Sequence, residues 1–123
     1  MTELIICTTC RTTDTPREHR AAGDILLEAV QAAQAFGEQP KWAMVTVRAM
    51  ACLGGCSRSC TAAFQAQGKH SYLFGDLAAT DDVAQQLLDC AALHQLAPDG
   101  ALPRESRPSA LVGGMLARLP PAL

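Results

Sequence analysis

Five of the six cysteines in this 123-residue chain fall into two clusters, Cys7-x2-Cys10 and Cys52-x3-Cys56-x3-Cys60. Thiolate sulfur is a soft ligand that selects iron–sulfur clusters, zinc or cuprous copper. Two cysteine groups separated in sequence can each supply part of one site once the chain folds. The spacing therefore predicts a metal or cluster site that uses both groups.

Structural disulfides are the competing explanation for clustered cysteines. The chain begins Met1-Thr2-Glu3-Leu4, without the basic segment and long apolar stretch of a secretory signal. We therefore expect a cytoplasmic protein. In a reducing cytosol, clustered cysteines more often serve metal or redox chemistry than structural cross-links.

The glycines of the second cluster favour an iron–sulfur cluster over bare zinc. Gly54 and Gly55 lie between Cys52 and Cys56. Glycine adopts positive φ at low cost, and successive backbone N–H groups then form a nest that stabilises anionic sulfur. Zinc is satisfied by four thiolates, and its sites more often carry Cys-x2-Cys on both sides. Zinc stays the alternative cofactor.

Composition excludes other classes of function. The formal net charge is −2 and the basic residues are scattered, so we expect no nucleic-acid partner. No apolar run approaches the roughly twenty residues that a membrane-spanning helix needs. We also expect no substrate chemistry, so the chain is not predicted to be an enzyme.

The apolar periodicity predicts six elements in the first 97 residues. Residues 4–6 form a short apolar run that ends at Cys7. A capping box at residues 15–18 and Gly23-Asp24 are two possible starts for the first helix. We expect strands at 4–7, 42–50, 61–67 and 70–75, a helix at 24–36, and a second helix between the Thr80 cap and Pro98.

This order, β-α-β-β-β-α, predicts an α/β fold: a thioredoxin-like, four-stranded mixed sheet with packed helices, formed by residues 1–97. Residues 98–123 carry five of the seven prolines and form a proline-rich C-terminal extension. Apolar residues between Leu111 and Leu119 stand at near-helical spacing. We expect a short helix there, packed on the domain itself or on a second subunit or partner.

The strand followed by Ala51-Cys52-Leu53-Gly54-Gly55-Cys56, and then by a hairpin with Gly68-Lys69 and Tyr72-Leu73-Phe74-Gly75, resembles the thioredoxin-like 2Fe–2S ferredoxins. The resemblance implies a small electron carrier with one 2Fe–2S cluster. It also implies that Cys52, Cys56 and Cys7 are ligands. Over the whole chain, the two cysteine clusters and the tail are similar to a bacterial family of uncharacterised, predicted metal-binding proteins.

The fourth ligand is either Cys10 or Cys60. The ferredoxins place their second early ligand further along the chain than Cys10, and they usually have no cysteine at the place of Cys60. We favour Cys10, because the Cys7-x2-Cys10 spacing lets both sulfurs reach one metal ion, and we expect Cys60 to be a nearby thiol.

The remaining candidates are expected to be structural. Cys90 lies on the second predicted helix, where a buried, inert thiol is expected. His19, His70 and His94 are separated from the cysteines in sequence and are expected at the surface or in packing.

Two other functions stay open. One is a metal-handling protein for zinc or cobalt, with a possible link to corrinoid synthesis. The other is a dithiol oxidoreductase, which the sequence disfavours because a catalytic Cys-x2-Cys normally opens a helix, whereas a polar loop follows Cys10. For the electron carrier we expect a redox partner protein that the sequence does not identify, and a homodimer is possible.

Overall fold

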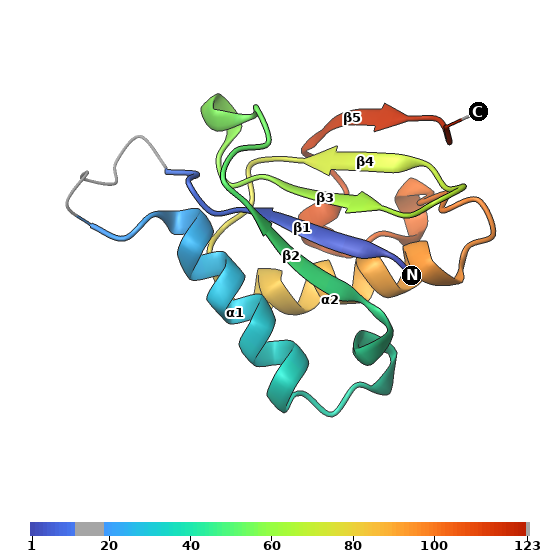
Figure 1. Ribbon diagram of the computed structural model, residues 1–123, viewed down its shortest axis with the longest axis horizontal. Helices are drawn as coiled ribbons and strands as arrows, with labels where there is room; N and C mark the ends of the chain where they lie inside the picture. The colour runs from blue at the N-terminus through green and yellow to red at the C-terminus, as the bar shows by residue number, and fades with distance from the viewer. Residues whose placement is uncertain (12–18, 123) are drawn as a thin grey trace.

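The computed structural model describes residues 1–11 and 19–122, and Cys56 by its backbone alone. Five strands form one mixed sheet, and α1 and α2 pack against each other on one face of it (Figure 1). The helices and strands are β1 (Glu3–Cys7), α1 (Ala22–Phe36), β2 (Thr46–Met50), β3 (Ala62–Gln65), β4 (Ser71–Phe74), α2 (Asp81–Leu96) and β5 (Met115–Leu119). Neither α1 nor α2 has the length and apolar character needed to cross a membrane.

The strand order is β2-β1-β3-β4-β5. β1 pairs in parallel with β2, with Cys7 opposite Met50, and it pairs antiparallel with β3, with Ile6 opposite Ala62. The remaining pairs are antiparallel. The predicted mixed sheet with packed helices is therefore confirmed, but it contains five strands rather than four.

The additional strand replaces the short helix expected in residues 98–123, and that expectation is wrong. β5 pairs with β4, with Ala117 opposite Leu73. Gly114 precedes β5 at φ 76°, and its carbonyl oxygen accepts a hydrogen bond from the Gly75 N–H at 2.8 Å. This turn aligns the tail with the edge of β4, where unpaired backbone groups favour a strand over a helix.

The strand expected at residues 42–50 begins only at Thr46, because residues 40–44 form a 3-10 turn instead. Pro40 has no N–H for a strand ladder. Trp42 is buried, and its Nε1–H donates to Asp89 Oδ1 of α2 at 2.8 Å. Gln34 of α1 donates to the carbonyl oxygens of Trp42 and Val45. These contacts with both helices hold the segment out of the sheet.

The structure shows the other elements close to where the sequence predicts them. α1 begins at Ala22, close to the expected Asp24, whereas the predicted capping box at 15–18 lies outside the described residues. Thr80 caps α2 as predicted, because its Oγ1 accepts the Val83 N–H at 3.2 Å. The β3–β4 hairpin turns at Gly68, whose φ is 74°.

His94 on α2 is confirmed as a packing residue. It is fully buried, with Nε2 2.7 Å from the His70 carbonyl oxygen and Nδ1 2.8 Å from Thr2 Oγ1. A carbonyl only accepts, so Nε2 carries the proton and Nδ1 accepts from the Thr2 hydroxyl. This network ties the start of β1 to the end of α2. Burial lowers the pKa of His94, because the charged imidazolium would lose its hydration.

We expect the free energy of unfolding to fall as the pH decreases from about 7.5 to about 5, partly through His94. The unfolded imidazole takes up a proton near its ordinary pKa of 6.5, whereas the folded form resists protonation. This contribution is therefore complete above that value and is lost as the pH falls through and below it.

Urea titrations of the wild type and of His94→Gln across this range measure the effect. The variant should lose about 1–3 kcal/mol at the upper pH, because buried partners are left unsatisfied, and should show a flatter pH dependence. The exposed control His19→Gln should keep the wild-type slope. An unchanged slope in His94→Gln would contradict the prediction.

Candidate metal centre

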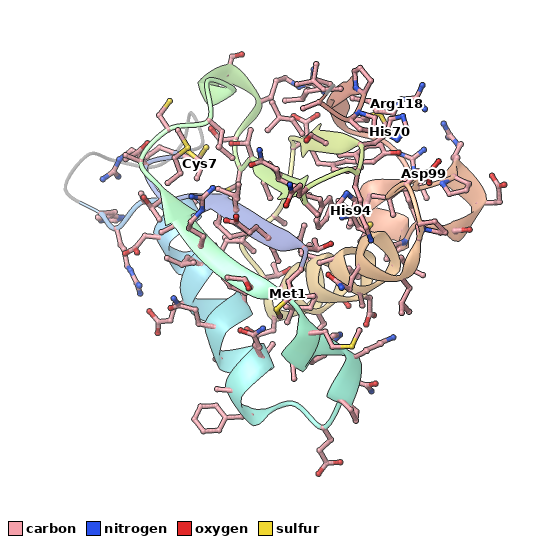
Figure 2. All side chains as sticks on the ribbon, turned by 45° about the vertical axis from the view of Figure 1, so that its right-hand side comes forward. Met1, Cys7, His70, His94, Asp99 and Arg118 are labelled. Carbon is pink, nitrogen blue, oxygen red and sulfur yellow. The ribbon has the colours of Figure 1, made fainter. Side chains whose placement is uncertain are left out.

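The C-terminal end of β1 places Cys7 at the edge of the sheet where the β2–β3 loop also lies. The Cys7 N–H donates to the Thr61 carbonyl oxygen at 3.2 Å, and the Thr8 N–H donates to the Met50 carbonyl oxygen at 2.9 Å. The end of β1 is therefore held from both neighbouring strands. Figure 2 shows Cys7 at this edge, with a second sulfur beside it and His94 well away from it.

Cys7 ends β1, and Cys10 follows it in the buried turn after this strand. Each residue is 1% exposed, and the Cys10 side chain is among the causes that lower the pKa of Cys7. Cys10 Sγ also lies 3.3 Å from the Thr61 hydroxyl. Burial raises the pKa of Cys10, and the Thr61 hydroxyl offsets part of this rise.

The loop after β2 points backbone N–H groups at sulfur, as the glycine pattern predicts. The Leu53 amide hydrogen-bonds to the Cys7 sulfur, and the Gly54 N–H donates to Cys52 Sγ at 3.3 Å. Gly54 has a φ of 83°, which permits this tight turn. Burial acts to raise the pKa of Cys7, but the hydrogen bonds from Cys10, Leu53 and Thr9 outweigh it and lower that pKa to about 7.

Gly23 in the first turn of α1 lies directly against the Cys7–Cys10 turn. Its N–H donates to the Cys10 carbonyl oxygen at 3.0 Å. A Cβ at this position would lie 1.9 Å from the Cys7 carbonyl oxygen. A glycine is therefore required for the helix to approach the cysteines. α1 therefore begins beside Cys7 and Cys10, although a polar loop separates this helix from them in the sequence.

Cys60 lies behind this pair, towards the core. It is fully buried, and its N–H and carbonyl oxygen both pair with Leu77 at 3.1 Å. Burial, together with the nearby Cys10 and Cys7, raises the pKa of Cys60 to about 11. Cys52, in contrast, is exposed.

Cys90 is buried on α2, as expected, and burial raises its pKa to about 12. Cys7, Cys10, Cys60 and Cys90 are free thiols in the structure.

The structure brings Cys7, Cys10, Cys60 and the Cys52 loop to one edge and keeps His94 away from it. His94 contacts Thr2 at the opposite end of β1. Among the described side chains, no three Cys, His, Asp or Glu residues are grouped as ligands of one metal ion. The predicted four-cysteine set is not tested by this, because the Cys56 side chain is not among them.

Sequence reasoning missed three residues that shape the site. Thr61 contacts Cys10, Gly23 admits α1, and Leu116 of β5 packs over the cysteine loop. A Cβ on Gly55 would lie 2.7 Å from Thr61 Cγ2 and 3.4 Å from Leu116 Cδ1. Thr61 follows Cys60 directly, which is a local signal. Nothing local marks Gly23 or Leu116, because their roles arise from packing.

The fold is thioredoxin-like. The structure is similar to that of a thioredoxin-like [2Fe-2S] ferredoxin from Aquifex aeolicus, with a TM-score of 0.56 over 99% of this chain and 96% of that chain. The two sequences are 12% identical, so the similarity establishes the fold. No curated protein shows significant sequence similarity to the chain.

The chain belongs to the family described as "Protein of unknown function (DUF1636)", whose model matches residues 4–121. The match extends from β1 to the tail beyond β5, so the C-terminal extension is part of what defines the family. The resemblance to bacterial metal-binding proteins stays a prediction, because this description assigns no metal.

We expect Gly23→Ala to destabilise the protein by about 2–3 kcal/mol, because the new methyl group overlaps the Cys7 carbonyl oxygen. Urea denaturation measures the change. The matched control is Gly113→Ala, where a Cβ meets nothing within 4 Å, and its effect should stay within about 0.5 kcal/mol. Equal stability of the two variants would show that α1 does not press on the cysteine turn.

Proposed function

We propose that the protein is a small electron-transfer protein that binds one 2Fe–2S cluster through Cys7, Cys10, Cys52 and Cys56. One observation carries the proposal: the loop that bears Cys52 lies against the buried Cys7, with the Ala51 carbonyl oxygen 3.8 Å from the Cys7 sulfur, and the Gly54 N–H of this loop donates to Cys52 Sγ. Thiolates together with inward amides form the donor set that iron–sulfur clusters use. When bound, such a cluster supplies reversible transfer of one electron.

The cysteines would have different roles in such a site. Cys7 and Cys10 are buried and would anchor the inner side, whereas Cys52 is exposed and would face a redox partner. The Leu53 and Gly54 amides stabilise negative charge on sulfur, and hydrogen bonds of this kind help to set a cluster's reduction potential. Cys60 would remain a thiol behind the ligands. We do not propose that the protein catalyses a reaction on a substrate.

Zinc is the second candidate for the same site, because the lowered pKa of Cys7 suits any soft cation. A protein that handles zinc or cobalt, with a possible link to corrinoid synthesis, would use the same thiols. Inward amides favour the cluster, because sulfide adds acceptors that bare zinc lacks. A cytoplasmic location, a redox partner protein and a homodimer belong to the proposal as expectations.

Protein purified without oxygen from cells supplied with iron should contain about two iron atoms and about two acid-labile sulfides per chain. Metal analysis, sulfide analysis and the visible absorption spectrum measure this. A red-brown colour that bleaches on reduction by dithionite is expected. Stoichiometric zinc without sulfide would contradict the cluster and favour the metal-handling function.

Substitutions of single cysteines should separate ligands from structural thiols. Cys52→Ser, Cys56→Ser and Cys10→Ala should each abolish stable cluster binding, whereas Cys60→Ala and the control Cys90→Ser should retain it. Iron and sulfide content per folded chain is the measurement, with circular dichroism to confirm folding. Loss in Cys60→Ala with retention in Cys10→Ala would instead assign the fourth ligand to Cys60.

A further inference from the structure

The second half of the cysteine loop, residues 55–60, packs closely on the turn that follows β4. A Cβ on Gly75 would lie 2.8 Å from the Arg58 carbonyl oxygen and 3.0 Å from Arg58 Cβ, so a glycine is needed for this approach. The Cys60 N–H and carbonyl oxygen both pair with Leu77 of the same turn at 3.1 Å. This half of the loop is therefore attached to a segment that lies outside the loop.

Arg58 and Asp76 join these two segments through their side chains and their backbones. Arg58 Nε lies 2.9 Å and 3.0 Å from the two carboxylate oxygens of Asp76, and Arg58 Nη2 also donates to Oδ2. The Asp76 N–H donates to the Arg58 carbonyl oxygen at 2.7 Å, and the Arg58 N–H donates to the Gly55 carbonyl oxygen at 2.9 Å. The last bond closes the 3-10 turn Cys56–Arg58. The ion pair therefore holds the turn that contains the backbone of Cys56.

Asp76 has a backbone conformation that few side chains accept. Its φ is 58°, in the left-handed region, where aspartate and asparagine are tolerated better than other residues with a side chain. Glycine would relieve this strain, but it would also remove the carboxylate that binds Arg58. Asp76→Asn removes the charge and keeps a residue that suits the same backbone conformation, so this substitution isolates the ion pair.

We propose that Arg58 and Asp76 are positioning residues of the metal centre: their ion pair holds the Cys56–Arg58 turn in place, so that Cys56 can bind the cofactor without a rearrangement of the loop. The role in cofactor binding rests on the proposed function, because it takes Cys56 as a ligand, whereas the hold on the loop does not depend on any cofactor. Both side chains are 49% exposed, so salt weakens the pair. Exposed ion pairs contribute to order where the contact is bidentate, as it is here.

The sign of the effect of Asp76→Asn separates positioning from simple charge effects. A 2Fe–2S cluster on four thiolates carries negative charge, and a nearby carboxylate disfavours it. If charge alone mattered, Asp76→Asn would therefore hold the cluster longer. If Asp76 acts by holding Arg58, the same variant loses the cluster faster. Arg58→Gln does not make this distinction, because both explanations predict faster loss.

Amide hydrogen exchange of the reduced, cluster-free protein tests the hold on the loop. Asp76→Asn should raise the exchange rate about fivefold at residues 55–60 and leave the rates in α1 and α2 unchanged. The matched control is Glu3→Gln, which breaks the exposed Glu3–Arg48 ion pair of 2.7 Å at the other end of β1 from Cys7. It should leave the loop unchanged. Unchanged exchange at residues 55–60 in Asp76→Asn, or an equal rise across the whole protein, overturns the proposal.

Cluster lifetime tests the consequence for the metal centre. Each protein is reconstituted with ferrous iron and sulfide, and the loss of visible absorption in excess EDTA is followed. Asp76→Asn and Arg58→Gln should each shorten the half-life about tenfold, as loss of a residue that orients a ligand does. The double variant should lose the cluster no faster than Arg58→Gln, because both substitutions remove one interaction. A half-life in Asp76→Asn equal to or longer than that of the wild type, or additive effects in the double variant, overturns the proposal.

Salt tests the pair without a substitution. Raising sodium chloride from about 0.05 M to about 1 M screens exposed charges, so loop exchange should become faster in the wild type and change much less in Asp76→Asn. An equal salt effect in the two proteins overturns the proposal. If the wild type takes up no iron and sulfide, the proposed function fails, and the role of the pair in the metal centre fails with it. Exchange at residues 55–60 still decides whether the pair holds the loop.

Discussion

In β1, Leu4 and Ile6 are fully buried, while the backbone pairs with β2 on one side and β3 on the other. Parallel pairing puts the C-terminal ends of β1 and β2 at the same edge of the sheet. Antiparallel pairing puts the start of β3 at that edge as well. The Cys7–Cys10 turn, the Cys52 loop and Cys60 therefore meet because of where β1 lies, and the rest of the site depends on this pairing.

Cys7 and Cys60 are both buried, but their sulfurs lie in different hydrogen-bonding environments. Cys60 is enclosed and its pKa is raised to about 11, whereas hydrogen bonds to the Cys7 sulfur lower its pKa to about 7. Burial acts to raise the pKa of both residues, but only at Cys7 do hydrogen bonds outweigh it. A sulfur that accepts amide hydrogen bonds is stabilised as an anion, and one without them remains a thiol.

The C-terminal extension also supports the cysteine loop, through β5 and the turn before it. Arg58 near the cysteine loop forms an ion pair with Asp76, and the Asp76 N–H donates to the Arg58 carbonyl oxygen at 2.7 Å. The neighbouring Gly75 is held by Gly114 and covered by Leu116. β5 thus helps to hold the cysteine loop in place. Residues 98–123 are therefore a structural part of the domain.

The sequence by itself predicted the fold class and the elements, because their signals are local. The capping of α2 by Thr80, the turn at Gly68 and the apolar run before Cys7 all follow from nearby residues. Clustering and glycine content also predicted inward amides in the loop after β2, which Leu53 and Gly54 supply.

Only the tertiary structure decided which local preferences prevail. The tail from Leu111 to Leu119 has near-helical spacing, yet residues 115–119 form a strand because the open edge of β4 offers hydrogen-bond partners. Residues 42–45 are predicted as strand from the sequence. In the structure, the Trp42 hydrogen bond to Asp89 of α2 holds them outside the sheet. Likewise Gly23 approaches the cysteines through packing between elements distant in sequence, and no local pattern encodes that contact.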